Sequence, residues 1–400
     1  MRKRMIGRAV LISAILTALI FIVWTTFVLW IASAEPVVNV DRGGADRVGA
    51  VHFGGPDKPV GALSNLLARR IAAVPAGGSI YWATYYFRDR DLARALVAAQ
   101  RRGVHVLLVV DGDPRLETAN DAALAILRRL GKGLVVRPEP IEPFDQLSGK
   151  LHTKIYAFDS PAGRVAMIGS FNPSGDEGTD KATLDEIGDQ DRGHNMLIDV
   201  ISPGLVDTLI DQVKLLGARG GTIDRFDAHE NRIYRDRDTA LYFYPRLRAD
   251  IVEDEVDRLD RGDRLWAAIS HLKGDMVGRL ARAAKRGAEI LLVVHDTERR
   301  VPEVSVRRLS AAGVHIRRYR HPEALPMHAK FIVVERDGGF TSYTGSLNYN
   351  RNSRLLNDEV LMASRDPQLA LTLLGRLAEI ETEISGNYAG RAATTRPVNP

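Results

Sequence analysis

The apolar and polar positions of this chain form a strand–helix–strand pattern that occurs twice. Gly78–Asp111 reads GSIYWATYYFRDRDLARALVAAQRRGVHVLLVVD, and Gly262–His295 reads GDRLWAAISHLKGDMVGRLARAAKRGAEILLVVH. The two segments align without a gap at a constant offset of 184 residues, Gly78 against Gly262. Each begins with a short apolar run, continues with apolar residues at helical spacing and ends with a continuously apolar run. Such a unit favours two parallel strands joined by a right-handed crossover.

Both copies carry signals for the ends of the predicted helix. Asp91 and Asp275 are expected to be the N-caps, because an aspartate carboxylate accepts backbone amides at a helix start. Gly103 and Gly287 are expected to end the helices, because glycine readily adopts the left-handed conformation found there. The predicted strands are 80–85, 104–110, 265–269 and 288–294.

A second block of the repeat follows after a gap. Leu151–Asn172 aligns with Met327–Asn348 at a constant offset of 176 residues. Each copy then continues with an apolar run that predicts a strand and with a closing segment at helical spacing. The predicted strands are 195–201 and 359–363, and the predicted helices are 203–217 and 367–384. The repeated unit covers roughly 150 residues, the size of one domain, so the pattern predicts an α/β fold with two similar halves.

The repeat divides the chain into segments. The stretch between the halves is polar and is predicted to be a linker, whereas the stretch before the first half is rich in Gly and Pro and is predicted to be extended. The tail has no periodicity and is expected to be disordered. The predicted segments are 1–34 (N-terminal signal-anchor or signal peptide), 35–60 (extended lead-in), 61–220 (first domain), 221–245 (linker), 246–388 (second domain) and 389–400 (disordered tail).

The N-terminal segment has the pattern of a targeting signal. Four basic residues among the first eight precede an uncharged, mostly apolar run at 9–34. A bilayer core needs about 20 apolar residues in a helix, so this run can span it. The positive-inside rule then predicts a membrane-anchored chain with the catalytic part outside the cytoplasm. Ala32-Ser33-Ala34 also has the form of a signal-peptidase site, so a secreted form cleaved after Ala34 is the alternative.

Composition narrows the chemistry. The chain has 55 basic and 50 acidic residues, and the net charge of +5 permits attraction to anionic lipid or nucleic acid without demanding it. It has no cysteine, which excludes disulfides, thiolate nucleophiles and cysteine-based zinc sites. Apolar residues make up 45% of the chain, which is enough for globular cores.

The second block of the repeat carries one His–Lys pair in each copy. The first copy reads LHTKIYAFD from Leu151, and the second reads MHAKFIVVE from Met327. Both segments are predicted to be strands, in which residues two apart share a face. His152 and Lys154 are therefore expected to point the same way, as are His328 and Lys330. A lysine followed by core residues is costly to bury unless an anion binds beside its ammonium group.

A Gly-Ser-x-Asn segment follows each histidine at the same distance. The segments are Gly169-Ser170-Phe171-Asn172 and Gly345-Ser346-Leu347-Asn348. The glycine permits a close approach of another backbone. Duplicated His, Lys, Ser and Asn side chains together predict a donor-rich pocket whose natural ligand is a phosphate diester.

These residue types support a specific reaction. Lysine ammonium and asparagine amide groups can stabilise the charge that develops on the phosphate oxygens. One imidazole can attack phosphorus, while the other protonates the leaving oxygen and later deprotonates water or an alcohol. Fixed lysines supply positive charge that other phosphodiesterases take from metal ions, so no metal or other cofactor is expected. The candidates for phosphate binding are Lys154, Lys330, Ser170, Ser346, Asn172 and Asn348, and the catalytic candidates include His152, Lys154, Asn172, His328, Lys330 and Asn348.

The duplicated motifs resemble the signature of the phospholipase D superfamily, HxKxxxxD followed by GSxN. This superfamily includes phospholipases D, cardiolipin synthases, related phosphatidyltransferases and some nucleases. The resemblance covers nearly all of the chain after about residue 60. It implies an α/β fold of two phospholipase D-like halves that pack with pseudo-twofold symmetry around one active site, a phosphohistidine intermediate and no required metal. By similarity, His152 is the expected nucleophile and His328 the expected general acid and base.

The two halves depart from the superfamily pattern in different ways. The acidic position of the motif, for which a structural role is expected, is Asp159 in the first half and Glu335 in the second. Asn357-Asp358-Glu359 resembles the family's downstream Asn-x-Glu, in which the Glu orients a histidine through its other ring nitrogen. Glu359 therefore joins the catalytic candidates. The first half has Asn195-Met196-Leu197 and no equivalent acid, so the two histidines are not expected to be interchangeable.

The first half also carries an acidic insert between its two Asn positions. A solvated loop is favoured over a calcium-binding rim, because the acids lack the regular spacing of a calcium loop. Asp111-Gly112-Asp113 is predicted to be a turn rather than a metal site. Tyr85–Phe87 is expected to line either an acyl or base pocket or the core. The acids of the insert are Asp176, Glu177, Asp180, Asp185, Glu186, Asp189 and Asp191.

Three functions follow from these features. The leading hypothesis is a membrane-associated enzyme that acts on phospholipid by hydrolysis or by phosphatidyl transfer to an alcohol. The alternative is a nuclease with the same chemistry, against which stand the modest basic excess and the lack of an aromatic–basic stripe. Both motifs lie in one chain, so no oligomer is required. A non-catalytic phosphate-binding module is the third possibility, and the completeness of both motifs argues against it.

Overall fold

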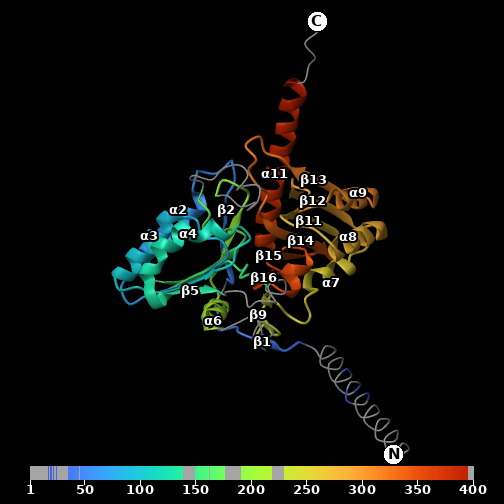
Figure 1. Cartoon of the computed structure of the whole chain (residues 1–400). Coiled ribbons are helices and arrows are strands. Elements are labelled where there is room, and N and C mark those ends of the chain that lie inside the picture. The colour runs from blue at the N-terminus through green and yellow to red at the C-terminus, as the bar shows by residue number, and fades with distance from the viewer. Residues whose placement is uncertain are drawn as a thin grey trace, which may run out of the picture. The chain divides into compact units, whose positions relative to one another are not determined.

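Figure 1 shows the chain as a computed structural model. The structure describes residues 35–44, 46–137, 149–161, 163–175, 191–218 and 229–394, together with residues 17, 19, 21 and 24. Residues 1–36 and 37–400 form two separate units. No helix within the described ranges is long and apolar enough to cross a membrane, and most of the predicted segment 9–34 lies outside those ranges.

The first sheet contains the strands of the first copy of the repeat. Its spatial order is β2-β8-β7-β6-β3-β4-β5. The β3, β4 and β5 strands are parallel to one another, and the other neighbours are antiparallel. The strands are β2 (Val48–Phe53), β3 (Ser79–Thr84), β4 (His105–Asp111), β5 (Leu134–Arg137), β6 (Ile155–Ser160), β7 (Gly163–Gly169) and β8 (Met196–Val200).

The second sheet repeats this arrangement and extends it at one edge. Its order is β1-β9-β10-β16-β15-β14-β11-β12-β13, with β11, β12 and β13 parallel. The parallel pairing predicted within each copy is therefore confirmed by β3 with β4 and by β11 with β12. The strands are β1 (Val37–Asn39), β9 (Ile233–Asp236), β10 (Thr239–Tyr244), β11 (Arg264–Ile269), β12 (Glu289–His295), β13 (His315–Tyr319), β14 (Lys330–Arg336), β15 (Gly339–Gly345) and β16 (Glu359–Ser364).

Helices cover both faces of each sheet (Figure 1). On the outer faces, one core joins the first sheet to α2 (Ala62–Ala73), α3 (Arg90–Arg101) and α4 (Asp121–Leu127), and another joins the second sheet to α7 (Ile251–Asp257), α8 (Asp275–Arg286) and α9 (Glu303–Ala311). A central core contains side chains from both sheets together with α6 (Pro203–Ala218) and α11 (Pro367–Thr394). The two halves are therefore held together by apolar burial, the main favourable contribution to folding.

The ungapped alignment of the first strands is wrong by one residue. It places Trp82 opposite Trp266, but Trp82 pairs with Tyr156 in its sheet, and the equivalent residue in the second sheet is Ala267, which pairs with Ile332. A shift of one residue moves every side chain of a strand to the other face. Accordingly, Trp82 is fully buried, whereas Trp266 is only partly buried. Trp82 pairs with Leu108 and Ala267 pairs with Leu292, so the first half has one more residue between its first and second paired strands. The sequence pattern does not reveal it.

The helix ends agree with the predictions only in part. Gly103 and Gly287 have φ angles of 91° and 105°, which confirms the left-handed conformation expected after each helix. The N-cap of α3 is Asp89, not Asp91, because the Asp89 side chain accepts the backbone N–H groups of Asp91 and Leu92 at 2.9 Å. In the second half Gly274 takes the N-cap position, and Asp275 is the first helical residue.

Three predicted segment boundaries need correction. The linker predicted at 221–245 contains β9 and β10. Every residue of β10 is buried, because its side chains enter the central core on one face and the outer core of the second sheet on the other. The lead-in predicted at 35–60 contains β1 and β2, which pair with different sheets. The tail predicted from residue 389 is wrong at its start, because α11 continues to Thr394.

Candidate active site

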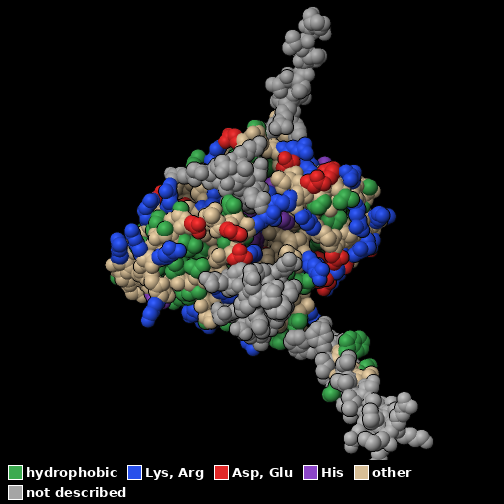
Figure 2. All heavy atoms as spheres, viewed as in Figure 1, with side chains coloured by type: hydrophobic (Ala, Val, Ile, Leu, Met, Phe, Trp, Pro, Cys, Tyr) green, Lys and Arg blue, Asp and Glu red, His purple; other side chains and the backbone are tan. Residues whose placement is uncertain are grey.

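A cavity of about 730 Å³ opens where the two halves meet. It lies beyond the carboxyl ends of β3, β4, β11 and β12, the edge of parallel strands at which α/β folds usually bind ligands. His152, Asn172, His328 and Asn348 all line it, so the structure brings both copies of the predicted motif into one site. Figure 2 shows the hollow on this face with histidine and basic side chains at its edge.

Each histidine lies just before a strand, not within it as predicted. The strands begin at Ile155 and Lys330, because the preceding residues pair across the halves instead of with a sheet neighbour. The backbone N–H of His152 donates to the carbonyl of Asp358 at 2.9 Å, and that of His328 donates to the carbonyl of His194 at 3.0 Å. The backbone of each half therefore positions the histidine of the other.

Each imidazole ring is likewise held by a side chain from the other half. His152 Nδ1 lies 2.9 Å from Glu359 Oε2, and His328 Nδ1 lies 2.9 Å from Asn195 Oδ1. When Nδ1–H donates to these oxygens, the lone pair of each neutral ring is on Nε2. The sequence identified Glu359 but missed Asn195. Asn195 occupies the place of Glu359 in the first half, because Met196 and Val360, the residues that follow them, make the same bonds to Ser170 and Ser346.

The serines of the Gly-Ser-x-Asn segments lie behind these partners. Ser170 donates to Asn195 Oδ1 at 3.1 Å, Ser346 donates to Glu359 Oε2, and both serines are fully buried. Neither serine is among the residues that line the cavity. Their placement assigns them the positioning of the His partners in place of the phosphate contact expected from the sequence.

The glycines before these serines permit the arrangement. A Cβ added to Gly169 would lie 2.2 Å from the carbonyl oxygen of Met196, and one added to Gly345 would lie 2.1 Å from that of Val360. Such distances are far inside van der Waals contact. The close backbone approach predicted for both glycines is therefore confirmed.

The two lysines are buried beside the histidines. Lys330 Nζ donates to the carbonyl of His328 at 2.9 Å, and Lys154 Nζ donates to the carbonyl of His152. Both ammonium groups lower the pKa of both histidines, so their charges act on the whole site. Asn172 also belongs to this centre, and its Oδ1 accepts the hydroxyl of Thr84 and the N–H of Tyr86, each at 3.4 Å.

Burial keeps both imidazoles neutral at physiological pH. Desolvation lowers the pKa of His152 to about 4, Glu359 opposes this shift, and Lys154 adds to it. Desolvation also lowers the pKa of His328 well below its usual value, with further lowering by Lys330 and Lys154. The carboxylate partner is the main difference between the two rings. A neutral imidazole beside a carboxylate is the better nucleophile, because the imidazolium charge that forms on attack is stabilised.

Replacing Glu359 by Gln is expected to move the acid limb of the pH–rate profile to lower pH. His152 is the nucleophile predicted from the sequence and must then be neutral to attack, so kcat/KM should fall as the pH drops through its pKa of about 4. Removing the carboxylate removes an interaction that raises this pKa, so protonation then needs more acid. At neutral pH the rate should fall about 10- to 100-fold, because a second-sphere partner is lost. Kinetics of a soluble diester from pH 3 to 8, with circular dichroism to verify folding, would test this; an acid limb that moves to higher pH would contradict it.

A buried polar network supports the pair formed by Asn195 and His328. The neighbouring His194 is 1% exposed, and its Nε2 lies 3.1 Å from Glu383 on α11. Its Nδ1 accepts a hydrogen bond from Arg376 at 3.0 Å. The carbonyl of His194 also accepts the backbone N–H of His328, so the network links α11 to the position of this histidine.

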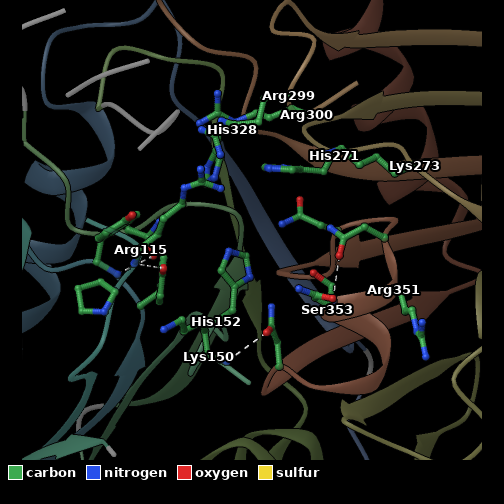
Figure 3. Close-up of a pocket in the computed structure, with 18 of the residues that line it drawn as sticks. Arg115, Lys150, His152, His271, Lys273, Arg299, Arg300, His328, Arg351 and Ser353 are labelled. Atoms are coloured by element: carbon green, nitrogen blue, oxygen red, sulfur yellow. Dashed lines mark hydrogen bonds between the residues drawn. The ribbon is translucent and has the colours of Figure 1, made fainter. Parts of the chain in front are cut away.

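The rim of the cavity contains side chains that the motifs did not indicate. Arg115 and Arg299 follow β4 and β12 at equivalent positions of the repeat, 184 residues apart, so the alignment contained a signal for them. Tyr85 and Tyr86 line the cavity, whereas Phe87 lies in the outer core. Other rim residues are Asp113, Pro114, Glu117, Lys150, His271, Lys273, Gly274, Arg300, Asn350, Arg351, Asn352, Ser353 and Asn357 (Figure 3).

The remaining predicted residues lie away from the reacting groups. Asp159 and Glu335 pair with Arg164 and Arg264 near the far ends of their strands. Asp111 accepts the N–H groups of Leu151 and Asp113 at 2.6 and 2.9 Å, which confirms a turn at this position. Within the described part of the chain, no group of three or more His, Asp or Glu residues could hold a metal ion. The acidic insert lies outside the described residues except for Asp191, which is buried.

Comparison of the sequence with protein families identifies one match. A sequence model of the family described as "Cardiolipin synthase, PLD-like domain" matches residues 72–179 and 258–380, which together make up more than half of the chain. Each matched range contains one His–Lys pair and its Gly-Ser-x-Asn segment. No curated protein matches the chain.

Two of the matching solved structures align with most of this chain. The phosphatidylserine synthase of Haemophilus influenzae Rd KW20 aligns with a TM-score of 0.58 and 13% identity over 84% of this chain and 88% of its own. A polyphosphate kinase of Porphyromonas gingivalis aligns with a TM-score of 0.53 and 17% identity over 83% of this chain. The alignment spans 50% of the length of that kinase. At these identities the similarity concerns the fold alone.

Proposed function

This chain belongs to the phospholipase D-like family of cardiolipin synthase domains, and on that premise we propose that it cleaves or transfers the phosphatidyl group of phospholipids through a phosphohistidine intermediate. The observation that carries this proposal is the crossed pair of histidines in one cavity. Two imidazoles held through Nδ1, two buried ammonium groups and two amides match what a phosphate diester needs for displacement at phosphorus.

The first step is an attack of His152 Nε2 on phosphorus. The N–P bond forms as the bond from phosphorus to the leaving oxygen breaks, and His328 donates a proton to that oxygen. His328 is neutral in the empty cavity, and an anionic diester beside it favours the protonated form. Glu359 stabilises the positive charge that develops on His152.

The second step reverses the roles. His328 accepts a proton from water or an alcohol, the new O–P bond forms, and the N–P bond to His152 breaks. Water as acceptor gives hydrolysis, and an alcohol gives transfer. Lys154, Lys330, Asn172 and Asn348 are proposed to stabilise the charge on the non-bridging oxygens in both steps.

Membrane association is part of the proposal and rests on the sequence alone. The apolar run at 9–34, preceded by basic residues, supports an anchored chain with its catalytic part outside the cytoplasm, or a secreted form after cleavage at Ala34. An enzyme that acts on phospholipid benefits from being held near the bilayer. The alternative activity, cleavage of DNA or RNA by the same chemistry, is supported by the cationic side chains on the rim.

The test is turnover of three diesters in the presence of EDTA. The purified protein is incubated with phosphatidylcholine, phosphatidylglycerol and single-stranded DNA, and released head groups and DNA fragments are measured. Head-group release that disappears in His152→Ala is the expected result. DNA cleavage without lipid turnover would contradict the lipid assignment. A folded protein that turns over none of the three would favour a phosphate-binding module.

A further inference from the structure

His194 is a buried histidine to which the proposed reaction gives no step. It precedes Asn195, whose Oδ1 lies 2.9 Å from Nδ1 of His328, the general acid and base. The backbone N–H of His194 donates to the carbonyl of Pro326 at 2.9 Å, and its carbonyl accepts the N–H of His328 at 3.0 Å. The place of His194 therefore fixes both the backbone of His328 and the peptide group that carries the Asn195 amide.

Two charged side chains hold the ring of His194, and both come from α11, the long helix at the centre of Figure 1. Arg376 Nη2 lies 3.0 Å from Nδ1 of the ring, and Glu383 Oε2 lies 3.1 Å from Nε2. A guanidinium group has no acceptor, so Nδ1 accepts, and the proton of the neutral ring is on Nε2 and is donated to Glu383. Burial lowers the pKa of His194, which keeps the ring neutral at physiological pH. The two side chains therefore fix both the tautomer and the orientation of this ring.

Glu383 is itself held in place by a second donor. The hydroxyl of Tyr319 on β13 donates to Glu383 Oε1 at 2.7 Å. The ring of Tyr319 also lies edge-on against that of His194, with 4.6 Å between the centroids. Burial raises the pKa of Glu383, but the hydrogen bonds from His194 and Tyr319 outweigh it, and the pKa lies below its usual value. Glu383 is therefore a carboxylate that accepts one hydrogen bond on each oxygen.

Arg376 reaches Asn195 by a second route. It is 4% exposed, and its Nη1 and Nη2 donate to the two carboxylate oxygens of Asp57 at 2.6 and 2.7 Å. Its Nη2 also donates to the carbonyl of Gly54 at 3.2 Å, and the N–H of Gly54 donates to the carbonyl of Asn195 at 2.9 Å. The backbone of Asn195 is thus tied to α11 through Gly54 as well as through His194.

The uncharged partner of His328 makes this support important. Glu359 contacts His152 directly, and its charge attracts the ring proton in addition to orienting the ring. Asn195 carries no charge, so its hold on His328 depends on the length and direction of one hydrogen bond. Loss of the network should therefore move His328 and leave His152 in place.

We propose that His194 and Glu383 are positioning residues for His328. By holding Asn195 in place, they keep the His328 imidazole in the orientation in which its Nε2 exchanges a proton with the leaving or the attacking oxygen. This inference rests on the proposed function and adds to it a carboxylate that does not line the active-site cavity. Neither residue is part of the duplicated motifs.

The experiment compares two leaving groups in single turnovers of the full-length protein. Short-chain phosphatidylcholine releases choline, an alcohol that needs a proton, and phosphatidyl-p-nitrophenol releases p-nitrophenolate, which needs none. Glu383→Leu and His194→Phe are each expected to slow the release of choline about 10- to 100-fold, because a small misplacement of a catalytic group is enough for such a loss. Release of p-nitrophenolate should slow by less than about two-fold, because that step requires no general acid. Glu383→Gln keeps an acceptor for His194 and should release choline within about three-fold of the wild-type rate.

The matched control is Glu381→Leu, which removes a carboxylate from the same helix. Glu381 pairs with Arg317 and His315 at 3.8 and 3.9 Å, so this variant should release choline like the wild type. A double variant supplies a second control. When Glu383→Leu is added to His328→Ala, no further loss is expected, because the positioned group is already absent.

A purely structural role would give other results. Equal slowing with both leaving groups, or a further loss when Glu383→Leu is added to His328→Ala, would overturn the proposal. Choline release at the wild-type rate in both Glu383→Leu and His194→Phe would overturn it as well. Thermal unfolding verifies that each variant is folded. Tyr319→Phe, which removes only one hydrogen bond from Glu383, replaces a variant that does not fold, and the same contrast between leaving groups is then measured.

Failure of the proposed function has a different signature. If the wild type cleaves neither substrate, the reaction is contradicted, and the positioning is then tested by nitrogen-15 NMR of histidine-labelled protein. The signals of His328 are assigned by comparison with His328→Ala, and they should show the ring proton on Nδ1. Glu383→Leu should shift these signals, and Glu381→Leu should not. Identical His328 signals in the wild type and Glu383→Leu would contradict the positioning role.

Discussion

Replacing His152 by alanine is expected to abolish turnover of every diester, with a loss of at least about 10⁴-fold in kcat. The proposed phosphohistidine intermediate requires the Nε2 atom of this ring. A substrate with a good leaving group, such as a p-nitrophenyl ester, should not recover activity. The loss should be the same for lipid and soluble substrates, because the substituted residue makes the bond to phosphorus.

Replacing His328 is expected to have a different effect. The variant His328→Ala should lose about 10²- to 10⁴-fold with an alcohol leaving group, the usual contribution of general acid catalysis. It should lose much less in the first step with p-nitrophenolate, which leaves without protonation. Hydrolysis of the phosphohistidine also needs His328, which accepts the proton of the attacking water. The phosphohistidine should therefore accumulate in this variant and be detectable by mass spectrometry of the intact protein.

The contrast between the two variants assigns the nucleophile. His105→Ala is the matched control, because His105 is an exposed histidine on β4 outside the cavity, and it should retain full activity. Thermal unfolding should verify that each variant is folded. Accumulation of the adduct in His152→Ala and not in His328→Ala would reverse the assignment.

Replacing Lys330 by methionine is expected to lower kcat/KM about 10²- to 10³-fold, equivalent to about 3–4 kcal/mol of transition-state stabilisation. Methionine keeps most of the length and apolar contact of the side chain while removing its charge. Lys330 is 2% exposed, so its ammonium group acts where water screens little. Lys154→Met should behave similarly, because the charges of both lysines act on both histidines.

The Lys330→Met substitution is expected to affect thermal stability differently from kcat/KM. A buried cation carries a desolvation cost, so Lys330→Met should leave the unfolding temperature unchanged or raise it. Kinetics with a soluble diester and calorimetric unfolding of the same preparation would separate the two effects, and Lys285→Met is the matched surface control. A Lys330→Met variant with nearly wild-type kcat/KM would contradict the role assigned to this lysine.

Much of the fold was contained in the repeat. The strand–helix–strand pattern at 78–111 and 262–295 predicted parallel pairs in both sheets, and both occur. The pattern failed where the signal depended on one residue or on distant contacts. The extra residue between β3 and β4 leaves the apolar composition of the strand unchanged, so periodicity does not detect it. Thr239–Tyr244 lies in a mostly polar stretch of the sequence. It becomes a buried strand because its side chains pack into the central core and into the outer core of the second sheet.

The amino-acid sequence by itself determined which chemical groups the protein has, since the duplicated His, Lys, Ser and Asn residues at matched spacing indicate two copies of one phosphate-handling motif. The tertiary structure decided which group acts on which. Glu359 holds the histidine of the other half, and Asn195 does the same in return, because β8 and β16 begin beside the opposite motif. It also brought Lys273, Arg299, Arg300 and Arg351 from separate loops to one cavity. Hydrogen bonds and charges act through distances in space, and spacing along the chain does not encode those distances between the halves.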